Sequence, residues 1–275
     1  MIKKLIFFIL LSLCVALQAS AWNPMITTSG KSESGATAIC TSFTPGDPYD
    51  VLCEDIENSS NFWGGESWTD NIDAPNTFAA ADHTDTFNCS EKGLKAAQVF
   101  IDFENGDGAG KTTVISATEL YVQGYINITV NSIDTSTWAT VFNIYETDEF
   151  SGGGLTRLDI YHDGSNLVFQ HYIRTDGPGS EYNYSSALSL NTWYYIELYW
   201  KASTQNGSWF AFTPAGGSRT QYTANEDETT ENNTATVFGL GVTHDGGTDA
   251  TDELTYLIDM VAVDKTTGFT KCSGF

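Results

Sequence analysis

Basic residues are scarce in this chain. It has 12 Lys and Arg against 35 Asp and Glu, which gives a formal net charge of −23 at pH 7. Nucleic acids and anionic lipids are bound by basic surfaces that neutralise phosphate groups, so neither is expected as a partner. The acidity itself suits solubility, and an acidic ligand site is the alternative interpretation.

Long apolar runs are scarce as well. Beyond the N-terminus, none reaches the roughly 18 residues that a membrane-spanning helix needs. The N-terminus has the three parts of a secretory signal peptide: Lys3 and Lys4, an apolar stretch over residues 5–17, and the small-x-small sequence Ala-Ser-Ala at 19–21. We expect residues 1–21 to be removed on export, which leaves a secreted or periplasmic protein.

A lipoprotein is the alternative product of export. Cys14 would then carry the lipid, but Leu13 stands where a small residue is needed. We therefore favour a soluble product that begins near Trp22.

Cysteines are few, and no CxxC motif or nearby histidine pair is present, so a zinc site is not expected. Four cysteines remain after removal of the signal peptide, and an even number in an exported chain suggests two disulfides. Three pairings are possible. We favour Cys40–Cys53 and Cys89–Cys272, the second of which would tie the C-terminal tail to the body of the protein.

No segment shows a long helical period. From about residue 93 onward, short runs typical of β-strands are separated by Gly, Asn, Asp and Ser, and the turn sequences HDGSN (162–166) and TQNGS (204–208) favour hairpins. This spacing predicts an all-β antiparallel sandwich that forms a single domain over residues 50–275. Residues 22–49 are expected to form a loop-rich leader.

The sequence ENGDGAGKTT (104–113) resembles a nucleotide-binding loop only superficially. A phosphate-binding loop needs glycine where Asn105 stands, and it needs a helix afterwards, whereas TVISATELYV is typical of a strand. We interpret the segment as a turn at the rim of the sandwich, with a solvated Lys111. Its acidic neighbours Asp102, Glu104 and Asp107 are candidate oxygen ligands for Ca²⁺.

Several predicted strands between residues 120 and 200 alternate between aliphatic side chains and tyrosine or polar side chains. Successive side chains of a strand point to opposite sides of a sheet, so the aliphatic set predicts a core-facing surface and the other set a second surface. This second set comprises Tyr121, Gln123, Tyr125, Asn143, Tyr145, Asp159, Tyr161, Gln170, Tyr172, Arg174, Tyr195, Glu197 and Tyr199.

Tyrosine rings among amides and carboxylates suit a sugar site. Aromatic rings stack on the C–H faces of pyranoses, and polar groups bind the hydroxyls. The competing interpretation is that tyrosine has a high β propensity and simply covers an exposed sheet.

Three stretches carry a resemblance to a known superfamily: ELYVQGYINI (119–128), SALSLNTWYYIELYWK (186–201) and LTYLIDMVAVD (254–264). Over roughly residues 50–268 the chain resembles the concanavalin A-like lectin/glucanase jelly roll, in particular laminin-G-like domains of secreted bacterial proteins. The resemblance implies two antiparallel sheets with a concave ligand face, binding of glycans or proteins, and a structural Ca²⁺ near the rim.

Enzymes share this fold, but their motifs are incomplete here. The glucanase motif E-x-D-x-x-E is matched by Glu146, Asp148 and Glu149 only in part, and Ser151 takes the place of the second catalytic carboxylate. Alginate-lyase-like members carry Gln-x-His on a strand. Here Gln170 directly precedes His171, so the two side chains are expected on opposite faces, with His171 on the aliphatic side.

Two further loops allow both a functional and a structural interpretation. The acidic sequence HDGGTDATDE contains a second set of candidate calcium ligands, namely Asp245, Asp249, Asp252 and Glu253. In FWGGESW, Trp63 and Trp68 are expected either to plug the core or to form a ligand platform.

These observations favour a secreted, non-catalytic carbohydrate-binding protein that requires no cofactor. A polysaccharide lyase or glycosidase that uses the same face is one alternative. A structural or adhesive surface protein with protein partners is the other.

Overall fold

The computed structural model describes residues 50–54, 68–82, 95–103, 108–146, 154–174, 180–202, 208–223, 234–242, 246 and 252–265. The chain divides into two compact units, residues 1–35 and 36–275, and every described residue belongs to the second. The described part contains strands and no helix, which confirms the all-β prediction. It therefore also contains no helix able to cross a membrane. The predicted signal peptide lies outside the described residues, as do Cys40, Cys89 and Cys272, so the predicted disulfides stay a prediction.

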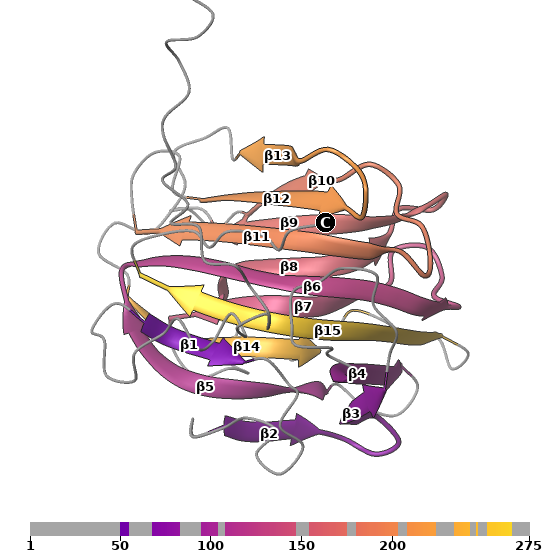
Figure 1. The fold of residues 1–275 in the computed structure, drawn as a ribbon, viewed down its shortest axis with the longest axis horizontal. Helices are drawn as coiled ribbons and strands as arrows, with labels where there is room; N and C mark the ends of the chain where they lie inside the picture. The colour runs from indigo at the N-terminus through magenta and orange to yellow at the C-terminus, as the bar shows by residue number, and fades with distance from the viewer. Residues whose placement is uncertain are drawn as a thin grey trace, which may run out of the picture. The chain divides into compact units, whose positions relative to one another are not determined.

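Sheet A is antiparallel throughout (Figure 1). Its strands are β1 (Asp50–Glu54), β3 (Thr77–Asp82), β4 (Lys95–Asp102), β6 (Glu119–Asn131), β11 (Trp193–Lys201), β12 (Ser208–Pro214), β13 (Thr220–Thr223) and β15 (Glu253–Asp264). Their order across the sheet is β13-β12-β11-β6-β15-β4-β3, and β1 also pairs with β15. The last strand in the sequence is therefore an inner strand of sheet A.

Sheet B is also antiparallel. Its strands are β2 (Trp68–Ile72), β5 (Ala109–Ala117), β7 (Trp138–Tyr145), β8 (Gly154–His162), β9 (Leu167–Arg174), β10 (Ser180–Tyr184) and β14 (Ala235–Val242). Their order is β10-β9-β8-β7-β14-β5-β2. The first four form a meander, and β14 then joins that meander to β5.

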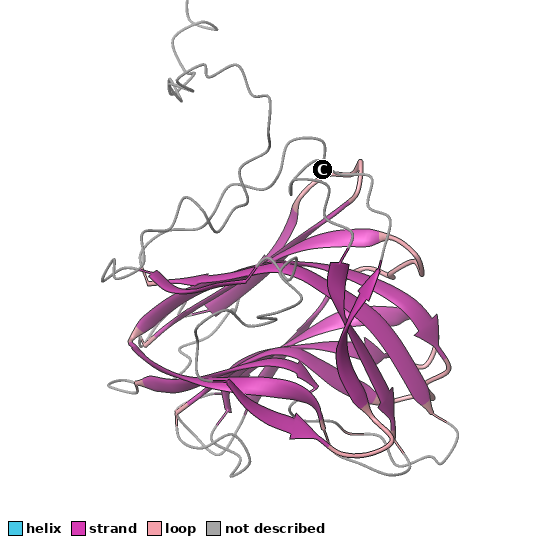
Figure 2. Ribbon diagram, turned by 60° about the horizontal axis from the view of Figure 1, so that its bottom comes forward, coloured by secondary structure: helices cyan, strands magenta, loops and turns pink. Residues whose placement is uncertain are grey.

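The two sheets are the layers of a sandwich (Figure 2). The predicted aliphatic faces meet in one core, whose members include Leu120, Val122, Ile126, Ile128, Phe142, Ile144, Leu158, Ile160, Leu167, Phe169, Ile173, Ile196, Leu198 and Trp200. The core-facing prediction is therefore confirmed, with the correction that these residues come from two opposed sheets rather than from one surface. Tyr256 links the layers, because its hydroxyl donates to the Thr140 carbonyl at 2.9 Å.

The turn predicted at HDGSN joins β8 and β9. Gly164 has φ of +96°, a region in which L side chains are strained. The carboxylate of Asp163 accepts hydrogen bonds from the amides of Ser165 and Asn166 at 2.8 and 2.7 Å. Gly164 supplies the required backbone conformation and Asp163 accepts the turn's amide hydrogen bonds, which explains why the sequence predicted this hairpin.

The segment 104–113 needs a correction. β5 begins at Ala109, so the second half of the segment is strand rather than turn. Lys111 is part of that strand and its ammonium lies 5.8 Å from the centre of the Phe78 ring, so it is more than a solvated loop lysine. A strand, not a helix, follows the glycines, which agrees with the rejection of a phosphate-binding loop.

Candidate functional site

The thirteen side chains predicted to share one surface lie on the outer faces of two sheets. Sheet A holds Tyr121, Gln123, Tyr125, Tyr195, Glu197 and Tyr199. Sheet B holds Asn143, Tyr145, Asp159, Tyr161, Gln170, Tyr172 and Arg174. The prediction of a single shared face is therefore wrong. Alternation assigns a residue to one side of its strand, but it does not say which sheet the strand joins.

In the middle of sheet A, the side chains on the outer face are buried. Tyr125 and Tyr195 are paired across β6 and β11, with ring centroids 5.1 Å apart. They are 1% and 4% exposed and belong to a second apolar cluster with Trp193 and Leu257. Burial raises the pKa of Tyr195 well above that of a free phenol. These side chains stabilise the sheet and are not accessible to a ligand.

Toward one end of sheet A, rings of three adjacent strands stack on one another. The ring centroids of Tyr121 and Tyr199 are 4.6 Å apart, and those of Tyr199 and Trp209 are 5.5 Å apart. The guanidinium of Arg219 lies 5.3 Å from the Trp209 ring and donates to Glu197 at 2.6 Å. These three rings are half-buried and pack against one another and a guanidinium, so they offer less free surface than the exposed tyrosines of β10 on sheet B.

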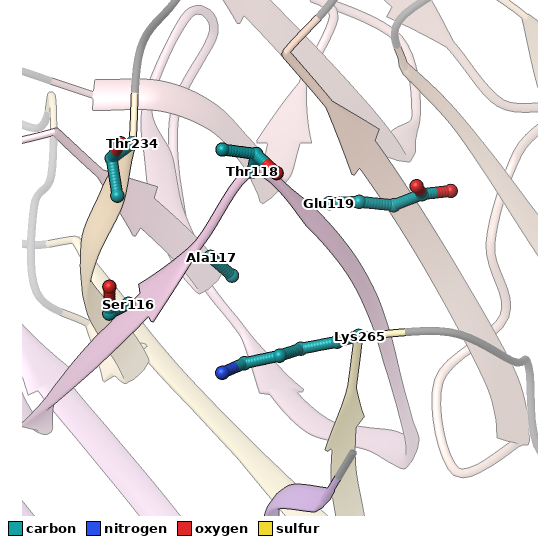
Figure 3. Close-up of a pocket in the computed structure, with 6 residues that line it drawn as sticks. All are labelled: Ser116, Ala117, Thr118, Glu119, Thr234 and Lys265. Atoms are coloured by element: carbon teal, nitrogen blue, oxygen red, sulfur yellow. The ribbon is translucent and has the colours of Figure 1, made fainter. Parts of the chain in front are cut away.

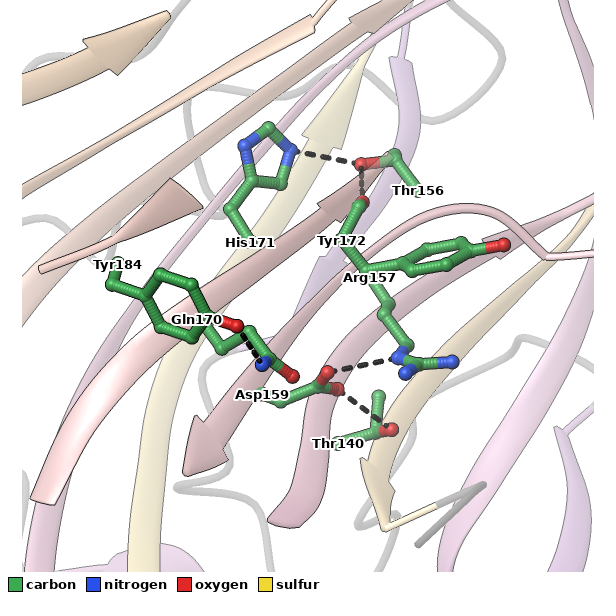
Figure 4. Close-up of polar contacts among 8 residues, drawn as sticks. All are labelled: Thr140, Thr156, Arg157, Asp159, Gln170, His171, Tyr172 and Tyr184. Carbon is green, nitrogen blue, oxygen red and sulfur yellow. Dashed lines mark hydrogen bonds and ion pairs between the residues drawn. The ribbon is translucent and has the colours of Figure 1, made fainter. Parts of the chain in front are cut away.

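The outer face of sheet B is organised around Arg157 on β8 (Figure 4). Its guanidinium carbon lies 4.1 Å from the centre of the Trp138 ring and 4.4 Å from that of Tyr172. Its Nε donates to Asp159 Oδ2 at 2.8 Å, and Thr140 donates to the other carboxylate oxygen at 3.1 Å. The two terminal amino groups of Arg157 donate to no described residue.

The Arg157–Asp159 pair is held in a fixed protonation state. Burial by itself would lower the pKa of the Arg157 guanidinium, but the attraction and hydrogen bond of Asp159 outweigh it, so the pKa is raised. Asp159 is fully buried. The arginine is therefore a permanent, positioned cation and its carboxylate partner is not available for proton transfer.

Exposed tyrosines border this pair on the edge strand β10. Tyr182 and Tyr184 are 42% and 45% exposed. Tyr182 packs edge-on against Tyr172 with centroids 5.5 Å apart, and Tyr184 lies 5.7 Å from Tyr161. Gln170 donates through Nε2 to the Tyr184 hydroxyl at 3.1 Å. Partly fixed rings thus lie beside a positioned cation on one sheet face.

Asn143 completes this face on β7. It pairs with Arg157 across the two strands and is only 1% exposed. Its Oδ1 has no hydrogen-bond partner among the described residues. A buried amide oxygen without a partner is costly, and an ordered water is a usual partner at such a position. At this exposure Asn143 supports the face from beneath and does not itself contact a ligand. We call Asn143, Arg157, Gln170, Tyr172, Tyr182 and Tyr184 the Arg157 face.

His171 faces the core, as predicted from its position next to Gln170. Its Nε2 lies 2.9 Å from the Thr156 hydroxyl and 3.0 Å from the Ser208 hydroxyl, so it bridges sheets B and A. Burial lowers its pKa to about 3. Figure 4 shows it on the opposite side of β9 from Gln170, and it therefore does not act on a ligand at the Arg157 face.

The acidic sequence candidates are only partly described. Asp102 ends β4, while Glu104, Asp107, Asp245 and Asp249 lie outside the described residues, so calcium stays a prediction. Asp252 is buried and accepts hydrogen bonds from the Thr137 hydroxyl at 2.8 Å and from the Asp134 amide at 3.1 Å. In this structure Asp252 stabilises the turn between β6 and β7.

The glucanase-like acidic motif is likewise only partly described. Glu146 forms an ion pair with Arg174 at 2.8 Å, and Asp148 and Glu149 lie outside the described residues. Trp63 also lies outside them, and Trp68 lies in β2. These positions therefore neither support nor oppose the enzyme alternative.

Sequence reasoning missed several members of this site. Arg157 precedes Asp159 by two positions, so alternation already placed both on one face, and the pattern Tyr-Asn-Tyr at 182–184 gave the same signal. Trp138 and Trp209 were missed for another reason. Their roles depend on arginines that reach them from another strand or from the loop before β13, and a single run of sequence does not reveal such contacts.

No protein-family model matches the chain, and no curated protein matches it significantly. Solved structures do match. The endo-β-1,4-glucuronan lyase of the fungus Trichoderma reesei gives a TM-score of 0.52 at 14% identity, over 79% of this chain and 96% of that one. The alginate lyase vAL-1 from Chlorella virus gives 0.51 at 11% identity, over 78% and 99%. A third match, the cellulose-induced protein Cip1, gives 0.50 at 12% identity, over 80% and 100%.

The chain shares a two-sheet, jelly-roll-type β-sandwich fold with these solved structures. Identities this low establish the sandwich and its topology, and activity has to be argued from the site itself. The Arg157 face, with a positioned cation beside two exposed tyrosines, is the candidate ligand site on the outside of sheet B.

Proposed function

We propose that this protein is a secreted, non-catalytic carbohydrate-binding protein whose Arg157 face contacts a polysaccharide. The observation that carries the proposal is the positioned guanidinium of Arg157, which lies between two aromatic rings and keeps both terminal amino groups for a ligand. Exposed Tyr182 and Tyr184 lie on the same face as apolar contacts for sugar rings. The signal-like N-terminus agrees with a polysaccharide met outside the cell.

Carbohydrate is favoured over other ligands by the mixture of groups. A sugar offers apolar C–H faces to aromatic rings and hydroxyls to amides and guanidinium groups, and the Arg157 face supplies both kinds of partner. Two of the matched solved structures are named as lyases of glucuronan and alginate, so this fold carries polysaccharide recognition in those proteins. Their low identity lends support only through the shared fold.

Binding is favoured over cleavage because the described face lacks a proton-transfer group. A general base has to accept a proton near neutral pH. Burial raises the pKa of Tyr172 and of Tyr184, which makes both phenolates rarer, and Asp159 is bound to Arg157. His171 lies in the core. No described residue on this face is thus in a state to accept a proton as a general base near neutral pH.

The test is affinity electrophoresis of the purified protein through gels that contain acidic or neutral polysaccharides, with alginate, glucuronan and cellulose derivatives in the panel. We expect retardation by at least one polysaccharide. The double substitution Tyr182→Ala/Tyr184→Ala should weaken it about tenfold or more, because two ring contacts are lost. Tyr121→Ala removes a ring from the outer face of sheet A and is the matched control.

Three results would contradict the proposal. Equal loss of retardation in Tyr121→Ala and in the double variant would remove the Arg157 face from the interaction, and no retardation by any polysaccharide would favour a structural or adhesive role. Ultraviolet absorbance from unsaturated uronates, or new reducing ends, would show that the protein cleaves its ligand.

A further inference from the structure

A pocket of about 400 Å³ lies at the turn between β5 and β6 (Figure 3). The residue that precedes β14 and the residue that follows β15 complete its wall. Its lining residues are Ser116, Ala117, Thr118, Glu119, Thr234 and Lys265. None of them belongs to the Arg157 face, and sequence reasoning gave none of them a role.

Lys265 is the positive group of this pocket. Figure 3 shows its side chain extending into the hollow toward Ala117 and Ser116. The ion pairs among the described residues use Arg157, Arg174, Lys201 and Arg219, and Lys265 takes part in none of them. In a chain with 35 acidic residues, an ammonium that is directed into a pocket and lacks a described carboxylate partner is available for a ligand.

The one carboxylate of the pocket is already compensated. Glu119 accepts a hydrogen bond from the Tyr199 hydroxyl at 2.7 Å and forms an ion pair with Lys201 at 3.3 Å. Figure 3 shows its carboxylate directed away from Lys265. Its negative charge is therefore compensated by residues of β11, and it repels an incoming anion only weakly.

The remaining polar side chains of the pocket carry hydroxyls: two lie at the connection between β5 and β6, and the third, Thr234, directly precedes β14. Ser116, Thr118 and Thr234 line the pocket, and each carries one hydroxyl. The turn is tied to the end of β11, because the amide of Ala202 donates to the Thr118 carbonyl at 2.8 Å. Hydroxyls beside one ammonium form a donor set that suits the oxygens of a carboxylate or sulfate group.

We infer that this pocket is a second binding site, which takes a monosaccharide-sized ligand bearing an oxyanion. Lys265 provides the charge and the three hydroxyls provide hydrogen bonds to the oxyanion and the sugar hydroxyls. The volume lies within the range of about 300–1,000 Å³ that is usual for small-molecule sites. The site is independent of the proposed function, because it shares no residue with the Arg157 face.

The experiment is calorimetric or NMR titration of the purified protein with glucuronate, galactose 6-sulfate and glucose. We expect one or both anionic sugars to bind and glucose to bind at least about tenfold more weakly, since it lacks the charge-assisted contact. Lys265→Met should reduce anion binding by a similar factor. Lys111→Met, which removes the same charge from β5 outside the pocket, should leave it unchanged.

The two anions separate carboxylated from sulfated ligands. The inference would be overturned if glucose bound as tightly as the anionic sugars. It would also be overturned if the Lys265→Met protein had the melting temperature of the wild type and bound the anionic sugars as tightly. Absence of binding by both anions would overturn it as well. The Tyr182→Ala/Tyr184→Ala protein should keep this pocket intact, so failure of polysaccharide binding at the Arg157 face and failure of this pocket give different results.

Discussion

At the scale of single residues, the hydrogen bonds around His171 define its tautomer. The Thr156 hydroxyl donates to the Tyr172 carbonyl at 2.9 Å, and the Ser208 hydroxyl donates to the Tyr199 carbonyl at 2.8 Å. Each hydroxyl has one proton, so the shared contact with His171 needs a proton on Nε2. Nδ1 then holds a buried lone pair that has no partner among the described residues. The fold is therefore built for a neutral imidazole.

This neutral histidine predicts an acid-sensitive stability. The imidazole of His171 binds a proton near pH 6.5 in the unfolded chain but only near pH 3 in the folded chain. The stability that depends on its neutral form is therefore complete above pH 6.5 and is lost as the pH falls from 6.5 toward 3. From about pH 7.5 to pH 5 the free energy of unfolding should drop by about 2 kcal/mol from this group alone. Urea denaturation at several pH values measures the drop.

His171→Leu is the matched variant for that measurement. It removes the titrating group, while Thr156 and Ser208 keep their carbonyl acceptors, so its free energy of unfolding should fall about 2 kcal/mol less over the same range. Identical pH slopes for wild type and variant would mean that His171 accepts its proton inside the fold.

At the scale of elements, close approach of the two sheets depends on Gly124. A Cβ added at this position of β6 would lie 3.0 Å from the Phe142 ring and 3.5 Å from Val261. Gly124→Ala should therefore lower the free energy of unfolding by about 1–3 kcal/mol through overpacking, as measured by urea denaturation. Adding Phe142→Leu to Gly124→Ala should recover part of that loss, because the smaller side chain leaves room for the new methyl group. If the losses of unfolding free energy from the two substitutions simply add, the Phe142 ring does not restrict the space at position 124.

The long strands could be predicted from the sequence, and the short ones could not. β6 and β11 alternate over nine or more residues, which gave both the strand and its buried face. The edge strands β10 and β13 have five and four residues and mixed polar composition, so their local pattern was too brief to detect. Their pairing with β9 and β12 is what fixes them as strands.

The candidate site was half predictable for the same reason. Gln170, Tyr172 and Arg174 were expected on one face because they belong to one strand. Tyr121 and Tyr199 were expected beside them, but β6 pairs with β11 and β15 in sheet A. Strand partners that are many residues apart depend on the packing of the whole chain, and no local pattern encodes them.

At the scale of the whole molecule, the charge imbalance should oppose folding. A net charge of −23 creates self-repulsion, which added salt screens. The same salt weakens ion pairs, but pairs such as Lys201–Glu119 and Arg219–Glu197 are largely solvent-exposed and contribute little to stability. Moving from low to physiological or higher NaCl should raise the melting temperature by roughly 2–4 °C, which corresponds to about 1 kcal/mol for a domain of this size. An unchanged or lower melting temperature would show that repulsion is not significant.

The inner positions of β14 and β15 set the order of events when the protein is made. β15 separates β6 from β4 in sheet A, and β14 separates β7 from β5 in sheet B. Until residues 235–264 have left the ribosome, sheet A lacks the strand that joins β6, β4 and β1, and sheet B lacks the strand that joins β7 and β5. Both layers then have unpaired edges and exposed apolar faces. The sandwich is therefore completed only after these residues have been synthesised, and the earlier strands remain incompletely paired until then.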